Sequence, residues 1–129
     1  VAKFQISAAG NVLVTGSGGL GYGTGAGGTV TQATSKSTGV TLNTSAGQIT
    51  MNNAALAATT NVAFTLTNSL ISVNDVLIVN VAGGAATAGT YNVFTSTLAA
   101  GSATIVLRNI SAGSLSEAVV INFAIIHGQ

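Results

Sequence analysis

The chain has 129 residues, of which only 4% are charged, and its formal net charge is +1. Nucleic acids and anionic membranes are bound by clustered lysine and arginine side chains, so this composition argues against both kinds of partner. The sequence contains no cysteine, which excludes disulfide bonds and thiolate metal sites, and no stretch approaches the roughly 18 continuous apolar residues of a membrane-spanning helix.

The scarcity of charge also bears on association between molecules. Thr, Ser, Asn and Gln have to form most of the polar surface, because the only charged residues are Lys3, Lys36, Asp75, Arg108 and Glu117. Such a surface gives little electrostatic repulsion, and few charges protect the edges of strands from pairing with other chains. We therefore predict that copies of the same chain, or a larger assembly, bury much of this surface.

Alternation of apolar and polar residues begins at the N-terminus. Phe4 and Ile6 form one short run, and Val12 and Val14 form a second run after a turn at residues 8–11. Two such runs around a turn predict a β-hairpin. We divide the chain into a hairpin and glycine-rich arm at residues 1–28, which serves for attachment, and a β-sandwich domain at residues 29–129. The candidate interface residues of the first part are Phe4, Ile6, Val12, Val14 and Tyr22.

The glycine-rich stretch contains a match to a nucleotide-binding motif. Residues 16–21, GSGGLG, fit the pattern G-x-G-x-x-G after a predicted strand. A dinucleotide site also needs a helix that begins at the third glycine and an acidic residue about 20 positions further on, and neither is present. We interpret residues 16–28 as an extended arm or packed loop, in which the lack of side chains lets backbones approach closely.

The remainder of the chain reads as a series of short strands. Apolar positions at Val40 and Leu42, and at Ile49 and Met51, mark two of them, whereas residues 53–58 form at most one helical turn. The clearest strand is 61–68, with Val62, Phe64 and Leu66 inward and Thr65 and Thr67 outward. Residues 75–81 are more continuously apolar, and we expect them to be covered on both faces. Further strands are expected at 91–94, 103–107 and 118–126, the last despite a capping-box pattern at 114–117. This spacing predicts an all-β fold, an antiparallel β-sandwich of jelly-roll type.

Few residues are available for chemistry. Asp75 and Glu117 each lie beside an apolar strand, where we expect turn residues or a partner for Arg108. A Ser-His-Asp arrangement would have to combine Asp75 with His127, the only histidine, which stands third from the end. Three copies of His127 around a threefold axis could gather a metal ion, which stays an open alternative, as does a small hydrolase. We expect no enzyme, and assign no catalytic, cofactor-binding or metal-binding residue.

One long segment resembles a known family. Residues 21–43, GYGTGAGGTVTQATSKSTGVTLN, followed by GQITMNNAAL at 47–56, IVNVAGG at 78–84 and NISAGSLSEAVVINF at 109–123, resemble a module of tailed-bacteriophage structural proteins. Such modules occur in head-decoration, head-fibre and tail-fibre proteins. The resemblance implies a trimeric β-sandwich on the virion surface, and it carries over no catalytic residue.

The function expected from this resemblance is structural. We expect a capsid decoration or head-fibre protein that trimerises and stabilises the particle, assembled in the host cytoplasm and exposed on the extracellular particle. Its partners would be its own copies and the major capsid protein or other virion proteins, with no cofactor. The alternative is a tail-fibre module that recognises a host surface glycan, with Tyr22 and Tyr91 as candidate contacts.

Overall fold

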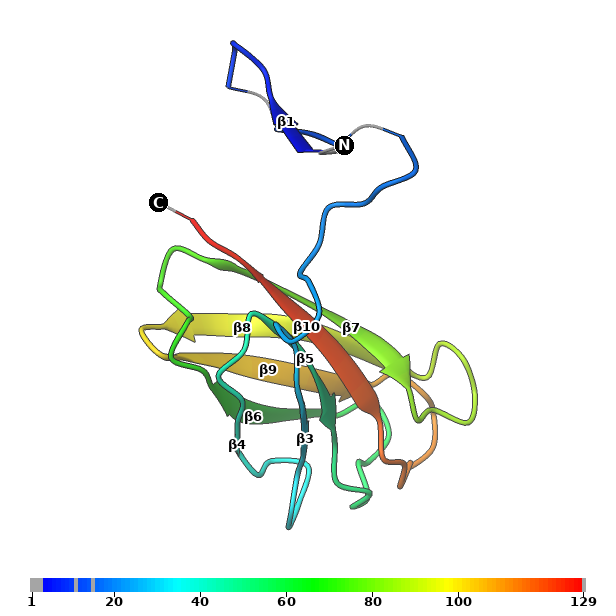
Figure 1. The fold of residues 1–129 in the computed structure, drawn as a ribbon. Helices are drawn as coiled ribbons and strands as arrows, with labels where there is room; N and C mark the ends of the chain where they lie inside the picture. The colour runs from blue at the N-terminus through cyan, green and yellow to red at the C-terminus, as the bar shows by residue number, and fades with distance from the viewer. Residues whose placement is uncertain (1–3, 11, 15, 129) are drawn as a thin grey trace.

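The computed structural model describes residues 4–10, 12–14 and 16–128, and of residues 4–6 and 13 it describes the backbone alone. Within these residues the chain is all-β, with no helix. Figure 1 shows two layers of strands and, apart from them, a small hairpin. The strands are β1 (Phe4–Ile6), β2 (Val12–Val14), β3 (Thr29–Thr31), β4 (Val40–Thr41), β5 (Ala46–Thr50), β6 (Asn61–Thr67), β7 (Val76–Gly83), β8 (Tyr91–Ala99), β9 (Ser102–Asn109) and β10 (Val120–Ile126).

Two sheets of four strands each form the main body. Sheet 1 has the order β3-β5-β10-β7, and sheet 2 has the order β4-β6-β9-β8. A single hydrophobic core lies between them, with Ile49, Ile121 and Phe123 from sheet 1 and Leu66 and Ile105 from sheet 2. The all-β prediction is confirmed, and the two sheets give the chain a sandwich-like architecture.

The prediction that the sheets are antiparallel is correct for only part of them. Strand β3 pairs with β5 in parallel, and β4 pairs with β6 in parallel, whereas the other pairs in the two sheets are antiparallel. From β3 to β8 each strand lies in the opposite sheet from the strand before it. Successive strands of one sheet, such as β3 and β5, are therefore separated by a strand of the other sheet and can run in the same direction. Both sheets are therefore mixed, which the local sequence pattern does not reveal.

The predicted orientation of residues 61–67 is confirmed in β6. Phe64 and Leu66 are buried and Val62 is partly buried, whereas Thr65 and Thr67 are exposed. The equivalent prediction for residues 75–81 is wrong within this chain. Strand β7 alternates strictly, and Val76 and Ile78 are 56% and 48% exposed, because among the described residues only the glycine-rich segment reaches that side of sheet 1, and it covers the face in part.

Buried polar residues hold the segment that joins β3 to β4. The side chain of Gln32 donates to the carbonyl oxygens of Lys36 and Thr38 and accepts from the N–H of Asn52. Lys36 is only 3% exposed, and its Nζ donates to the carbonyl oxygens of Asn52 and Glu117 at 2.5 Å each. Burial lowers the pKa of Lys36, while the Glu117 carboxylate acts in the opposite direction. Within the string TQATSK, the side chains of Gln32 and Lys36 thus hold this connection against the segments after β5 and before β10.

Candidate functional site

The N-terminal hairpin is formed as predicted. Strands β1 and β2 pair antiparallel from Phe4 opposite Val14 to Ile6 opposite Val12. Val12 and Val14 are 52% and 37% exposed, whereas the side chains of Phe4 and Ile6 lie outside the described part of the chain. In Figure 1 the hairpin stands away from the two sheets at the end of the glycine-rich segment, in agreement with the exposure of Val12 and Val14.

The glycine-rich segment crosses the outer face of sheet 1. No helix follows Gly21, and the described residues from 16 to 28 contain no strand. The Tyr22 hydroxyl donates a hydrogen bond to the carbonyl oxygen of Ile125, one residue beyond the position where β10 pairs with the first residue of β5. At its end the segment packs closely, as expected for glycines: a Cβ on Gly28 would lie 2.9 Å from the Leu42 side chain. Tyr22 thus ties the arm to β10, and the carbonyl oxygen of Gly28 accepts from the N–H of Gln48 in β5 at 2.9 Å.

An apolar groove lies between this arm and sheet 1. It encloses about 440 Å³ and is lined mainly by Leu20, Tyr22, Ile78, Ala124 and Ile126, with His127 at its margin. Leu20 is 82% exposed, Tyr22 47% and Ile126 54%. Leu20 was not among the residues that we selected from the sequence. It could have been selected, because Leu20 and Tyr22 are the only large apolar side chains between Gly16 and Gly28.

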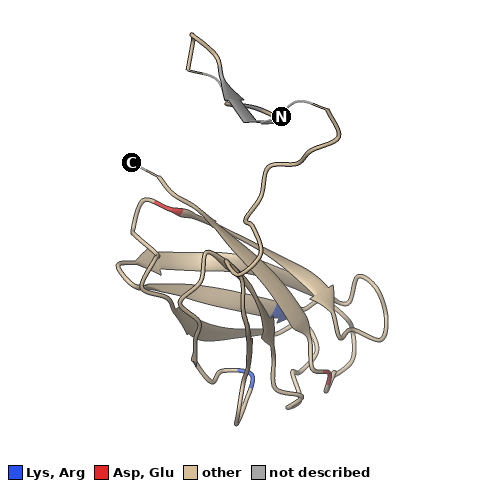
Figure 2. Ribbon diagram, in the orientation of Figure 1, with Lys and Arg blue, Asp and Glu red and all other residues tan. Residues whose placement is uncertain are grey.

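Electrostatics contribute little to this surface. The strands of sheet 1 contain no charged residue, and Figure 2 shows only a few charged positions scattered over the whole described fold. Of the charged residues, Lys36 and Asp75 are buried and Glu117 is partly buried, whereas Arg108 is exposed. The groove is therefore a candidate for apolar packing and offers no charge to an ionic ligand.

Asp75, Ser72 and His127 come together at the end of sheet 1, as a Ser-His-Asp arrangement would require. Their geometry differs from that of a catalytic triad. The Ser72 hydroxyl donates to Asp75 at 2.9 Å, and His127 Nδ1 lies 3.1 Å from the same carboxylate, so the aspartate stands between the serine and the histidine. Asp75 also accepts from the N–H groups of Ser72 and Gly128. Asp75 thus has the turn role that we expected, and it ties the C-terminal residues to the loop before β7.

The hydrogen bonds at Asp75 change its acidity. The N–H of Ser72 is the largest cause, and with the Ser72 hydroxyl, the N–H of Gly128 and His127 it lowers the pKa of Asp75 to about 2, against the opposing effect of burial. The carboxylate is therefore ionised across the ordinary pH range. Among the described residues, no group of three or more His, Cys, Asp or Glu side chains could hold a metal ion.

Tyr91 and Glu117 form a second polar cluster. Burial, followed by the neighbouring Glu117 carboxylate, raises the pKa of Tyr91 to about 12. Glu117 Oε1 accepts from the N–H of Ala86, whereas its Oε2 and the Tyr91 hydroxyl make no hydrogen bond of normal geometry within the described chain. Tyr91 is only 8% exposed. The two tyrosines selected as glycan contacts are thus not brought together, because Tyr91 belongs to the core and Tyr22 to the groove.

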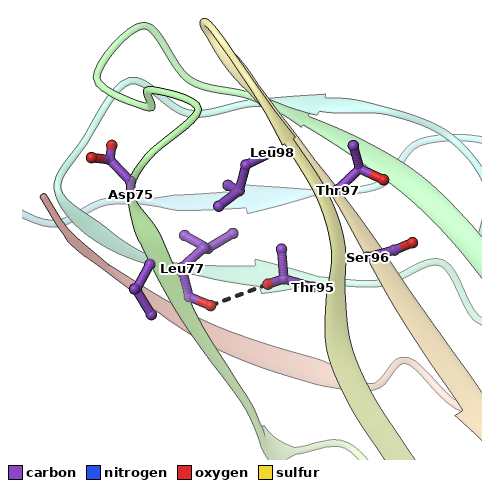
Figure 3. Close-up of a pocket in the computed structure, with 7 residues that line it drawn as sticks. Asp75, Leu77, Thr95, Ser96, Thr97 and Leu98 are labelled. Carbon is purple, nitrogen blue, oxygen red and sulfur yellow. Dashed lines mark hydrogen bonds between the residues drawn. The ribbon is translucent and has the colours of Figure 1, made fainter. Parts of the chain in front are cut away.

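A third feature is a shallow cleft between β7 and β8, at one edge of the two sheets (Figure 3). Thr95, Ser96 and Thr97 line it from β8, at the point where the pairing of β8 with β9 shifts by one residue. The Thr95 hydroxyl donates to the carbonyl oxygen of Leu77 in β7. This bond joins the edges of the two sheets, so we interpret the cleft as part of the closure of the fold.

Comparisons of the chain with protein-family models, with curated proteins and with solved structures found no match. In the part of the chain that the structure describes, no helix is long and apolar enough to cross a membrane.

Proposed function

We propose that this chain is a non-enzymatic structural protein of a tailed-bacteriophage virion, exposed on the particle surface as a homotrimer. The sequence resemblance of residues 21–43 and of the later segments motivates the assignment to phage particles. The fold would be a jelly-roll-like sandwich with a glycine-rich arm, in which the sheets trimerise and the hairpin attaches. Capsid decoration or a head fibre is the preferred location.

The observation that carries the proposal is the apolar groove on a surface almost free of charge. Soluble monomers avoid large exposed apolar patches and keep a net charge that prevents association. This chain has a net charge of only +1, and Leu20, Val76, Ile78 and Ile126 are all exposed to about half or more. A protein whose surface is covered by other subunits in the assembled particle does not need a polar surface or a large net charge to prevent association.

The hairpin supplies the attachment in this proposal. A two-stranded hairpin is marginally stable by itself in water, because it buries little apolar surface. Strands β1 and β2 have only three residues each, and Val12 and Val14 are exposed. A partner such as the major capsid protein would stabilise the hairpin by covering these residues. Many bound copies would then add buried area at the junctions between capsid subunits, which strengthens the shell without any chemical reaction.

The proposal is tested on virions of the phage that encodes the chain. Purified particles should contain the protein at many copies per capsid, and labelled antibodies should place it on the head in electron micrographs. Particles that carry a chain without residues 1–28 should lose the protein and break open at a lower temperature than wild-type particles. If the protein is absent from purified virions, the proposed function is wrong. Labelling confined to the tail would replace head decoration by the tail-fibre location.

A further inference from the structure

We infer that the outer face of sheet 1, together with residues 20–22 of the arm, is the surface through which copies of this chain pack against one another. This face, called the arm face below, consists of Leu20, Tyr22, Val76, Ile78, Ala124 and Ile126. Its occupant is the same face of further copies, arranged around a threefold axis. The inference rests on the proposed function and names the surface that the trimer uses.

The size of the arm face fits this role. Its exposed side chains are contiguous, because Ile78 lies opposite Ala124 and Val76 opposite Ile126 in the pairing of β7 with β10. With Leu20 and Tyr22 beside them, they present on the order of 500 Å² of apolar surface, which is at the upper end for the largest patch of a monomer. A specific interface buries about 800 Å² on each partner, and the neighbouring Asn80 and Asn122 would extend the contact.

The outer face of sheet 2 provides the contrast within the same chain. It presents Asn61, Thr65, Thr67 and Arg108, all of which are exposed, around an apolar spot formed by Ala63 and by Phe94, which is 39% exposed. Hydroxyl, amide and guanidinium groups are well solvated there, so water is a suitable neighbour for that side. The two outer faces thus differ although both belong to four-stranded sheets: the arm face carries no charged residue and exposes several large aliphatic side chains, whereas sheet 2 exposes one large apolar side chain among polar groups.

The glycines of the arm also support the packing of copies at this face. A Cβ placed on Gly19, Gly21 or Gly23 would meet no described atom within 4 Å apart from those of its chain neighbours, so no contact in the described part of the chain requires these positions to lack a side chain. Glycine is entropically costly in an ordered segment and is used where another backbone approaches closely. Three arms that run beside one axis would bring such backbones together. The same chemistry also selects the occupant: an uncharged apolar face gains nothing from a charged partner and is complementary to its own copy.

The first test is a double substitution in the arm face, Ile78→Thr with Ile126→Thr, which keeps the β-branched side chains that strands favour. The matched control is Ile110→Thr, because Ile110 is 49% exposed and lies in the loop after β9, outside the arm face. Light scattering coupled to size exclusion, over a range of concentrations, should give about 37 kDa for wild type and control, three times the 12.5 kDa of the chain. On dilution, the trimer of the double variant should dissociate at a protein concentration about 100-fold or more above that at which the wild-type trimer dissociates. Circular dichroism spectra of the wild type, the double variant and the Ile110→Thr control should show that all three are folded.

The second test does not depend on weakening the contact. The chain has no cysteine, so a single introduced cysteine can be cross-linked only between copies. A short bis-maleimide should join copies of the Ala124→Cys variant into dimers on a denaturing gel. Copies of the Thr65→Cys variant, altered on the outer face of sheet 2, should stay uncoupled.

The outcomes separate the inference from the function on which it rests. If the double variant remains as tightly trimeric as wild type, or if Thr65→Cys is cross-linked and Ala124→Cys is not, the arm face is not the contact, while the virion proposal stands. If the wild-type chain is monomeric at every concentration, this inference and the proposed trimer are both wrong. Detection of the protein in virions then decides separately whether it is a structural component.

Discussion

Replacing Lys36 with methionine tests whether a buried ammonium group holds the connection between β3 and β4. In the wild-type chain its Nζ donates to the carbonyl oxygens of Asn52 and Glu117, and 3% of the residue is exposed. Methionine keeps an apolar stem of similar length but removes every donor. Two carbonyl groups, from the segment after β5 and from the segment before β10, then lose their partner.

The expected loss of stability follows from these two groups. A buried acceptor without a partner costs about 1–3 kcal/mol. Part of this loss is offset, because removing Lys36 also removes the desolvation of its charge, the effect that lowers its pKa. We therefore expect the free energy of unfolding to fall by about 2–4 kcal/mol, a large share of the 5–15 kcal/mol typical of a domain.

The measurement is urea denaturation followed by far-ultraviolet circular dichroism at neutral pH. Protein concentration has to be equal for all variants, because association adds to apparent stability. The control is Arg108→Met, at an exposed position of β9, which should change the free energy of unfolding by less than about 0.5 kcal/mol. A Lys36→Met variant as stable as this control would refute the reasoning.

Three other predictions concern single positions. Asn109→Ala should lower the free energy of unfolding by about 2–4 kcal/mol in urea, because the two N–H bonds of this fully buried amide serve the carbonyl oxygens of Leu56, Ala57 and Gly113, one of them shared between two acceptors. Gly84→Ala should lower the melting temperature far more than Gly89→Ala: both have φ of +79°, but only at Gly84 would a Cβ collide with a backbone oxygen, that of Ala118 at 2.1 Å. The pKa of Asp75 is lowered to about 2, so its stabilisation is complete above the unfolded value of 3.8 and lost as pH falls toward 2. The stability difference between wild type and Asp75→Asn in acid titrations should therefore shrink over that range, and a constant difference would contradict the assignment.

Local patterns in the sequence predicted the strands well because each pattern needs only neighbouring residues. The alternation at residues 61–67 identified which side of β6 is buried. The two short apolar runs on either side of the turn at residues 8–11 identified the hairpin. The segment at 118–126 was correctly read as a strand despite the capping-box pattern, since β-branched residues fill β10. Turn residues and alternation act over a few positions, so they are visible in the order of amino acids.

The buried polar residues were harder to find. Nothing in the local sequence marks Gln32, Lys36 and Asn109 as buried, because side chains of these types are mostly exposed in proteins. Their partners lie up to 81 positions away in the chain, as for Lys36 and the carbonyl of Glu117. Leu20 stood out in the sequence as a large apolar residue among glycines, but its role depends on the face of sheet 1 beside it, which the local pattern does not show.

The sequence by itself determined that the chain is all-β, that it is poor in charge and where its strands and glycine-rich segment lie. Only the tertiary structure decided which strands are neighbours, that two pairs are parallel, and that one side of β7 stays about half exposed. Continuous apolar character in residues 76–79 looks the same whether the second face is covered by the same chain or by another molecule. The alternation of side chains is a local property of a strand, whereas its cover depends on contacts between distant segments.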